Sequence, residues 1–137
     1  MARAHSRPRL LVIDDDSFIT DLVVDLAGAA GYEARGANTP DAIFESLGPG
    51  NDLTMLDLSL PGVDVVTVLR EMFEAQPDGP VVLFTGAIDG SLEGARKVAA
   101  LYGLSIIGEY AKSDGLADLG PFLEELRIRL ARGDERQ

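Results

Sequence analysis

Apolar residues follow two patterns that alternate along the whole chain. Short unbroken apolar runs bounded by turn residues are typical of strands buried on both faces of a parallel sheet. Longer segments with apolar residues at i, i+3, i+4 and i+7 are typical of helices that pack on such a sheet. We expect strands at residues 9–16, 32–37, 53–58, 81–85 and 104–108, and helices at residues 17–31, 39–47, 63–75, 91–102 and 116–130.

Residues suited to helix ends support these boundaries. Ser17 can cap the first helix, and Gly31 can end it. Thr39 followed by Pro40 provides a cap and a first-turn proline for the second helix. Five strands that alternate with five helices predict an α/β fold, a doubly wound parallel sheet covered on both faces with right-handed crossovers.

Polar side chains stand where four of the predicted strands end. They are Asp14, Asp15 and Asp16 at the end of the first strand, Asp57 in the third, Thr85 in the fourth and Lys112 a few residues after the fifth. Because the carboxyl ends of parallel strands meet at one edge, where ligands bind in open α/β sheets, we expect these groups to lie together. An alternative for Asp57 is that it only caps the following helix.

The residue types at this edge predict a particular chemistry. Neighbouring carboxylates resist ionisation, and a divalent cation relieves their repulsion; a site with only oxygen ligands suits Mg²⁺. Asp57 could then attack phosphorus as a nucleophile, with the metal stabilising charge on the phosphoryl oxygens. Lys112 could pair with one of those oxygens, and the Thr85 hydroxyl could donate a hydrogen bond to another.

Four pieces of the chain stand in the order and spacing of a known family. They are Leu11-Val-Ile-Asp-Asp-Asp16, Leu56-Asp57-Leu-Ser-Leu-Pro61-Gly62, Leu83-Phe-Thr85-Gly86 and Lys112. On these motifs the chain resembles the receiver domains of two-component response regulators, including single-domain receivers of the chemotaxis type. The resemblance covers residues 9–131 and implies a (βα)5 flavodoxin-like receiver fold with strand order 2-1-3-4-5.

The same resemblance assigns a role to each residue of the edge. It implies that Asp57 is the phosphoacceptor, that Asp14, Asp15 and Asp57 hold Mg²⁺ together with the backbone carbonyl of Ser59, that Thr85 is the switch hydroxyl and that Lys112 binds the phosphoryl group. Asp16 matches a variable family position, and we interpret it as a solvated residue. The phosphoryl group would recruit Thr85 and Lys112 and so change the surface of the last two helices.

Family membership would also imply partners and a location. Receivers take the phosphoryl group from a histidine kinase or a phosphotransfer protein and hydrolyse it slowly, so the chain would be a signalling switch and not a dedicated metabolic enzyme. A downstream target or an output domain would read the switch, and two copies could pair through the last two helices. We expect a cytoplasmic protein.

Two residues depart from the family pattern. Glu109 stands three positions before the lysine, where most receivers have an aromatic switch residue, and Tyr110 stands beside it. Ser113 stands where receivers commonly have proline, so a trans peptide bond is strongly preferred there.

Residues 91–108 are also similar to receivers attached to cyclic-di-GMP phosphodiesterase domains of the EAL type. This similarity implies an output domain after the receiver or a free-standing relative.

Composition excludes several other functions. At 137 residues the chain fits one domain, which we place at 9–131 between a basic tail, 1–8, and a charged tail, 132–137. The net charge of -11 argues against direct binding of nucleic acid or of an anionic membrane surface. No cysteine is present, and the single histidine, His5, lies in the first tail. We expect neither a signal peptide nor a membrane span.

Two other classes of protein remain as alternatives. A haloacid-dehalogenase-type phosphatase also combines an Asp nucleophile, Mg²⁺, a hydroxyl and a lysine, and its nucleophile would be Asp14. That family's motif has Thr or Val where this chain has Phe18, and the chain is short for the fold with its cap. A phosphorylation-independent interaction module with the receiver fold is the other alternative, in keeping with Glu109 and Ser113.

Overall fold

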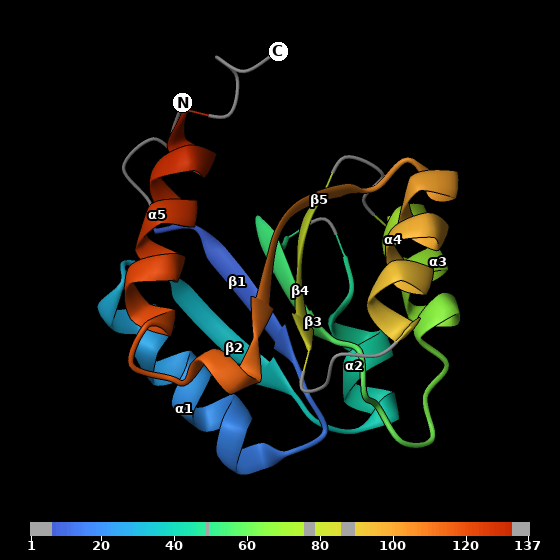
Figure 1. Ribbon diagram of the computed structural model, residues 1–137, viewed down its shortest axis with the longest axis horizontal. Helices are drawn as coiled ribbons and strands as arrows, with labels where there is room; N and C mark the ends of the chain where they lie inside the picture. The colour runs from blue at the N-terminus through green and yellow to red at the C-terminus, as the bar shows by residue number, and fades with distance from the viewer. Residues whose placement is uncertain (1–6, 49, 76–78, 86–89, 133–137) are drawn as a thin grey trace.

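A computed structural model describes residues 7–48, 50–75, 79–85 and 90–132. Within these residues, five parallel strands form one sheet in the order β2-β1-β3-β4-β5 (Figure 1). The strands are β1 (Arg9–Ile13), β2 (Glu33–Ala37), β3 (Leu53–Asp57), β4 (Pro80–Thr85) and β5 (Ser105–Ala111). The helices are α1 (Ser17–Ala29), α2 (Pro40–Ser46), α3 (Val65–Ala75), α4 (Gly90–Tyr102) and α5 (Leu119–Ala131), with a 3-10 helix η2 (Lys112–Asp114). The predicted fold and strand order are confirmed.

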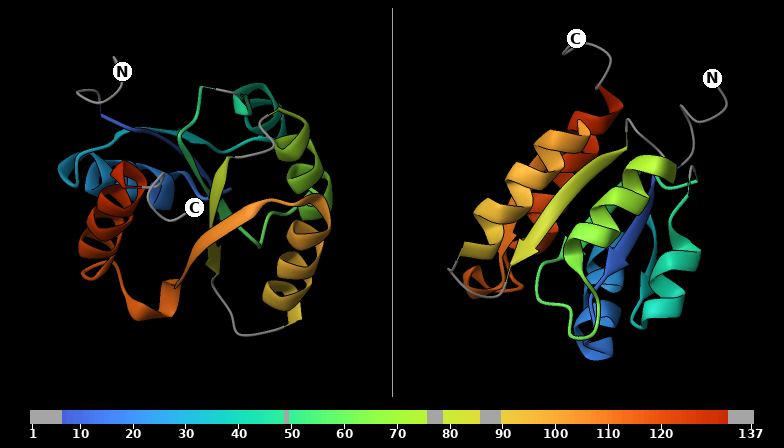
Figure 2. Two further views of the ribbon diagram at one scale, coloured as in Figure 1. Left: turned by 90° about the horizontal axis from the view of Figure 1, so that it is seen from above. Right: turned by 90° about the vertical axis from the view of Figure 1, so that its right-hand side faces the viewer.

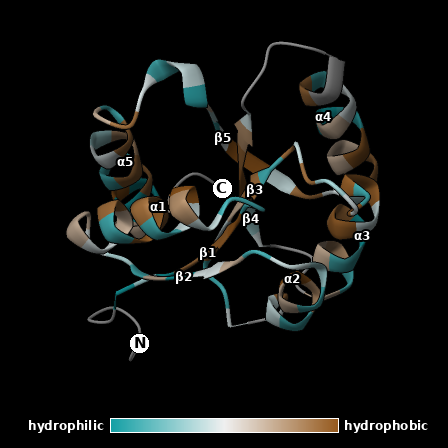
Figure 3. Cartoon of the chain, turned by 90° about the horizontal axis from the view of Figure 1, so that it is seen from below, coloured by the Kyte–Doolittle hydropathy of each residue, from teal (hydrophilic) through white to brown (hydrophobic). Residues whose placement is uncertain are grey.

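The sheet is the middle of three layers. Helices α1 and α5 cover one face, and α2, α3 and α4 cover the other (Figure 2). Strand β1 supplies both cores, because Leu10 and Val12 pack toward α1 and α5 whereas Leu11 and Ile13 pack toward the opposite layer. Strands buried on both faces need apolar residues at every position, which is why they appear as unbroken runs in the sequence. Figure 3 shows helices with both hydrophobic and hydrophilic surfaces around this sheet.

The predicted cap of the first helix is wrong by one residue. Asp16, and not Ser17, is the N-cap of α1, since its Oδ1 accepts hydrogen bonds from the N–H groups of Phe18, at 2.9 Å, and Ile19, at 3.3 Å. A carboxylate is favoured at this end of a helix because it also interacts with the positive end of the helix dipole. Asp16 is exposed, yet it has this structural role in addition to being solvated.

The cap of the second helix is confirmed. Thr39 Oγ1 accepts a hydrogen bond from Ala42 N at 3.2 Å, and Pro40 is the first residue of α2. Helix α3 begins two residues later than predicted, because Asp64 Oδ1 accepts a hydrogen bond from Val66 N at 3.0 Å. Helix α5 begins at Leu119 and not at residue 116.

Strand β5 is longer than the predicted 104–108. It pairs with β4 as far as Thr85 and Ala111, so Glu109 and Tyr110 belong to the strand and Lys112 follows it directly. These residues do not read as a strand in the sequence because β5 is at the edge of the sheet, where a charged residue can remain half exposed. The Lys112–Ser113 peptide bond is trans, as the serine predicts.

Within the described ranges, no helix combines the length and the apolar character needed to cross a membrane. Residues 1–6 and 133–137, including His5, lie outside these ranges.

Candidate functional site

The carboxyl ends of β1 and β3 bring two aspartates together. In these neighbouring strands Ile13 pairs with Leu56, so Asp14 and Asp57 follow at the same level on the same edge of the sheet. Both carboxylates are fully buried, whereas Asp15 beside them is exposed. One carboxylate oxygen from each of the three residues lies within 4.8 Å of the other two. The predicted gathering of acidic groups at this edge is present.

Lys112 lies between the two buried carboxylates. Its Nζ is 3.0 Å from Asp14 Oδ2 and 3.3 Å from Asp57 Oδ2. The ammonium also lies 5.1 Å from the centre of the Phe84 ring, on β4. Strand β5 delivers the lysine here because its pairing with β4 continues to Ala111, the residue before it.

Burial dominates the electrostatics of Asp57. Removal from water raises its pKa from 3.8 to about 6, and the neighbouring charge of Asp14 acts in the same direction. The N–H of Ser59, which donates a hydrogen bond to Asp57 Oδ1 at 3.1 Å, and the Lys112 ammonium act against this rise. Burial disfavours the charge on Lys112 as well, but its interactions with Asp14 and Asp57 outweigh this and raise its pKa.

The residues present fit a bound Mg²⁺ ion. Asp14 Oδ1 accepts a hydrogen bond from Asp16 N at 2.9 Å, but Asp14 Oδ2 is buried and accepts none from the described residues, with the Lys112 ammonium as its ion-pair partner. Three carboxylates and one ammonium leave the cluster with excess negative charge. Oxygen ligands from carboxylates are those that Mg²⁺ prefers.

Thr85 and Ser59 border this cluster. Thr85 is buried at the end of β4, one residue beyond the Phe84 that pairs with Asp57. Ser59 contacts Asp57 through its N–H group. Switching by Thr85 and metal binding by the Ser59 carbonyl remain predictions.

Glu109, one of the two departures from the family pattern, and its neighbour Tyr110 lie on opposite faces of β5. Glu109 lies on the side of α4, where it forms an ion pair with Arg96. Tyr110 lies in the core between the sheet and α5, with its ring centre 4.9 Å from that of Phe122, and its hydroxyl donates a hydrogen bond to Gly115 O. Tyr110, two residues before the lysine, is therefore a core residue.

Sequence reasoning missed two polar residues behind the acidic cluster. The Asn38 side-chain amide donates hydrogen bonds to Asp14 O, at 3.0 Å, and to Thr20 Oγ1, at 2.6 Å. Thr20 occupies a helical position with no motif around it. The only sequence signal is Gly36, an unusual residue inside a strand.

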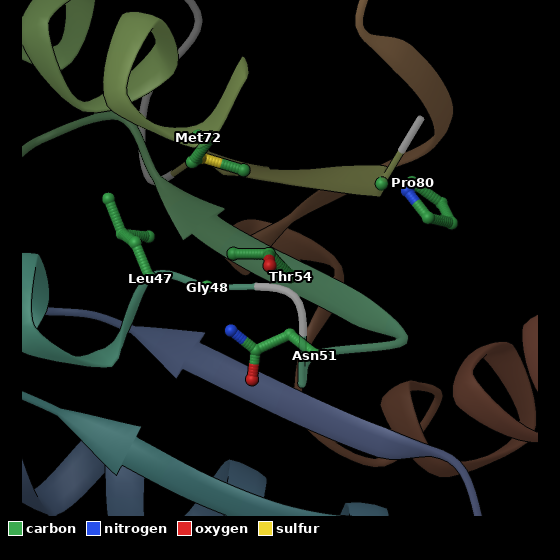
Figure 4. A pocket seen from close by; sticks show the side chains of 7 residues that line it. Leu47, Gly48, Asn51, Thr54, Met72 and Pro80 are labelled. Atoms are coloured by element: carbon green, nitrogen blue, oxygen red, sulfur yellow. The ribbon is translucent and has the colours of Figure 1, made fainter. Parts of the chain in front are cut away.

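A small cavity lies at the other end of the strands, away from the acidic cluster, and takes no part in this site. Figure 4 shows it between Leu47, Asn51, Thr54 and Met72, near the amino ends of β3 and β4. Its free space of about 20 Å³ suits a single water molecule.

The chain is similar in sequence to a receiver domain family and to known chemotaxis proteins and transcriptional regulators. The chain matches the model of the response regulator receiver domain family over residues 10–102. It is 31% identical over 121 residues to the protein-glutamate methylesterase/protein-glutamine glutaminase of Archaeoglobus fulgidus, a match that covers 86% of this chain and 34% of that protein. It is 27% identical over 81 residues to the chemotaxis protein CheY of Treponema pallidum, which covers 56% of each. The chain thus spans about a third to a half of the length of these curated relatives.

Solved structures share the fold. A response regulator from Colwellia psychrerythraea superposes with a TM-score of 0.75 at 26% identity, over 90% of this chain and 99% of that one. The response regulator TrrA from Thermotoga maritima, in complex with Mg²⁺ and BeF, superposes with a TM-score of 0.68 at 22% identity, over 87% and 98% of the two chains. Because the family match spans more than half of the chain, and because the fold and the acidic edge agree with it, this chain belongs to the family of response regulator receiver domains.

Proposed function

We propose that this receiver domain is a phosphorylation switch in which Asp57 accepts a phosphoryl group in the presence of Mg²⁺. The observation that carries the proposal is the environment of the fully buried Asp57 carboxylate, which lies with the carboxylates of Asp14 and Asp15 and with the Lys112 ammonium. Burial of so many charges is costly to stability. Perturbed titratable groups clustered at the ligand-binding edge of a sheet are a mark of function.

The proposed transfer forms one bond and breaks another. An Asp57 carboxylate oxygen forms a bond to phosphorus while the bond between phosphorus and a histidine nitrogen of the donor breaks, and the electron pair of that bond stays on the imidazole. A pKa of about 6 leaves most of Asp57 ionised at neutral pH, as a nucleophile must be. Lys112 would then pair with a phosphoryl oxygen, and the Thr85 hydroxyl would donate a hydrogen bond to another.

The proposed phosphoryl transfer uses Mg²⁺ as its cofactor. The carboxylates of Asp14, Asp15 and Asp57 and the backbone carbonyl of Ser59 would hold it, and it would supply positive charge beside the phosphoryl oxygens. The buried Asp14 Oδ2, whose partner among the described residues is the Lys112 ammonium, and the all-oxygen donor set support this choice. Further support comes from TrrA, a protein of the same fold, which binds Mg²⁺ with BeF.

The partners follow from the family. A histidine kinase or a phosphotransfer protein would donate the phosphoryl group, and a downstream target or an output domain would respond to it. The surface that changes would be that of α4 and α5, through which two copies could also pair. We place this signalling in the cytoplasm, in keeping with a chain that has no cysteine. The phosphoryl group would then be lost by slow hydrolysis in the same site.

Intact-mass spectrometry after incubation with acetyl phosphate tests the proposal. We expect a single base-labile phosphoryl adduct on the wild type, dependent on Mg²⁺, and none on Asp57→Asn. Asp21→Asn, which removes an exposed carboxylate on α1, is the matched control and should form the adduct like the wild type.

Other outcomes would point to the two alternatives. An adduct that survives in Asp57→Asn and disappears in Asp14→Asn would indicate the phosphatase-like nucleophile. A folded wild type that forms no adduct would contradict the switch and leave an interaction module with the receiver fold.

A further inference from the structure

The backbone of Asp14 is held from two other elements. Its N–H donates a hydrogen bond to Ala37 O, the last residue of β2, at 3.3 Å. Its carbonyl oxygen accepts hydrogen bonds from Asn38 Nδ2 at 3.0 Å and from Thr20 Oγ1 at 3.3 Å. The peptide that joins Asp14 to Asp15 is therefore fixed by a residue of α1 and by a residue of the loop between β2 and α2.

The polar groups in this network satisfy one another. The Asn38 amide has two N–H groups, and these reach Asp14 O and Thr20 Oγ1, so the orientation of the amide is determined by its partners. The Thr20 hydroxyl accepts the bond from Asn38 and has one hydrogen of its own, which lies within reach of Asp14 O and of Asp16 O at 3.0 Å. Thr20 is 2% exposed, so water does not compete for these bonds.

The strand beneath Thr20 is adapted to it. Gly36 in β2 has no side chain, and a Cβ atom at this position would lie 2.0 Å from Thr20 Cγ2. Any residue other than glycine would therefore push Thr20, and its hydroxyl, away from the Asp14 peptide. The methyl group of Thr20 packs on the strand while its hydroxyl faces the acidic loop.

We propose that Thr20 and Asn38 are positioning residues for the phosphoacceptor site. A peptide is planar, so fixing the Asp14 carbonyl also fixes the nitrogen of Asp15. The network thereby sets where the carboxylates of both residues lie, one buried and one exposed, relative to Asp57. Neither residue contacts a reacting group. The inference rests on the proposed function, because it concerns the residues that would hold Mg²⁺.

Two substitutions of Thr20 separate positioning from packing. Thr20→Val keeps the methyl group on Gly36 and removes the hydroxyl, whereas Thr20→Ser keeps the hydroxyl and removes the methyl group. We expect Thr20→Val to weaken Mg²⁺ binding about 10-fold, as is typical when a residue that orients metal ligands is lost. Thr20→Ser should bind Mg²⁺ like the wild type and only melt at a lower temperature. Isothermal titration calorimetry with Mg²⁺ alone, on the full chain, measures the dissociation constants.

Asn38→Ala and the double variant extend the test. Asn38→Ala should also weaken Mg²⁺ binding. Because both residues hold the same carbonyl, the fold-change in the Mg²⁺ dissociation constant of the double variant should be smaller than the product of the two single fold-changes. Thr54→Val is the matched control, since Thr54 is a buried threonine near the amino end of β3, away from the acidic cluster. Its Mg²⁺ affinity should equal that of the wild type.

The outcomes distinguish this inference from the function on which it rests. If the wild type binds Mg²⁺ and forms the adduct but Thr20→Val binds Mg²⁺ equally well, the positioning role is refuted and the switch stands. Equal losses in Thr20→Val and Thr20→Ser would likewise refute it, because packing would then explain both. A wild type that binds no Mg²⁺ would overturn the proposed function and this inference together.

Discussion

The Lys112 ammonium and the Asp14 carboxylate form a short ion pair, Nζ to Oδ2 at 3.0 Å, at the point where Asp57 is also within 3.3 Å of the same nitrogen. One cation is thus shared by two fully buried carboxylates. The oxygens that it contacts belong to the carboxylates that would also bind a metal ion. Lys112 therefore stabilises the metal-free site, and it would compete with a metal ion for these oxygens.

Replacing Lys112 should reveal both effects. Lys112→Met leaves two buried carboxylates without a cation. We expect the free energy of unfolding to fall by about 1–3 kcal/mol at pH 7 without metal. This loss is smaller than that expected for a fully buried ion pair, because the lysine is partly exposed. The Mg²⁺ affinity should rise severalfold. Urea unfolding and calorimetric titration measure the two quantities. Lys97→Met, on an exposed side chain of α4, should change neither; weaker Mg²⁺ binding in Lys112→Met would contradict the competition.

Stability should depend on pH through Asp57. Burial raises the pKa of this carboxyl from 3.8 to about 6, so the folded state binds its proton more tightly than the unfolded state does. The resulting stabilisation is complete below pH 3.8 and is lost as the pH rises through 6. Without metal, Asp57→Asn should therefore be more stable than the wild type above pH 6, by about 2–3 kcal/mol, and this advantage should shrink toward pH 4.

Urea unfolding of the two proteins at pH 4.5 and pH 7.5 checks this expectation. Asp15→Asn is the control, because its carboxylate is exposed on the same loop. An advantage of Asp57→Asn that is equal at both pH values would show that the ionisation of Asp57 is not its cause.

Much of the fold and of the acidic site could be predicted from the sequence because they depend on local patterns. Central strands are buried on both faces, so β1 and β3 appear as apolar runs, and a charged residue that ends such a run is conspicuous. The parallel order of the strands then brings Asp14 and Asp57 to one edge without any knowledge of side-chain contacts.

What could not be predicted depends on contacts between distant segments. Asn38 and Thr20 are 18 residues apart, and each is an ordinary residue type for its own position. The length of β5 is set by its pairing with β4, and not by its own pattern, which includes Glu109. The choice of Asp16 over Ser17 as a cap depends on a difference of one residue, which propensities do not resolve.

Gly36 should be intolerant of any side chain. Gly36→Ala places a Cβ atom 2.0 Å from Thr20 Cγ2, and we expect a loss of about 1–3 kcal/mol in the free energy of unfolding. Thr20→Ser removes that methyl group, so the double variant should recover most of the loss. Gly28→Ala in α1, where a Cβ atom would meet nothing within 4 Å, should instead raise stability by about 0.5–1 kcal/mol. Urea unfolding of Gly36→Ala, Thr20→Ser, their double variant, Gly28→Ala and the wild type measures these free energies. Equal losses of stability in Gly36→Ala and in the double variant would exclude the clash.

Tyr110 should remain in the core when the site is occupied. Its ring lies 6.2 Å from Phe84 and 4.9 Å from Phe122, centre to centre, and its hydroxyl is bonded to Gly115 O. Tyr110→Phe should lower the free energy of unfolding by about 0.5–1.5 kcal/mol, for one hydrogen bond, and leave the rate of adduct formation unchanged. Tyr110→Ala should cost about 3–5 kcal/mol, because a buried ring is lost.

Nuclear Overhauser contacts between the rings of Tyr110 and Phe122 are the direct measurement, made with and without acetyl phosphate and Mg²⁺. We expect the contacts to persist in both states, since leaving the core would expose a large apolar surface and open a cavity beside α5. The residue at the position of the family's mobile aromatic is Glu109, on the other face of β5. Loss of the ring contacts on phosphorylation would instead show that Tyr110 has taken over the switching role, with the β5 backbone rearranged to allow it.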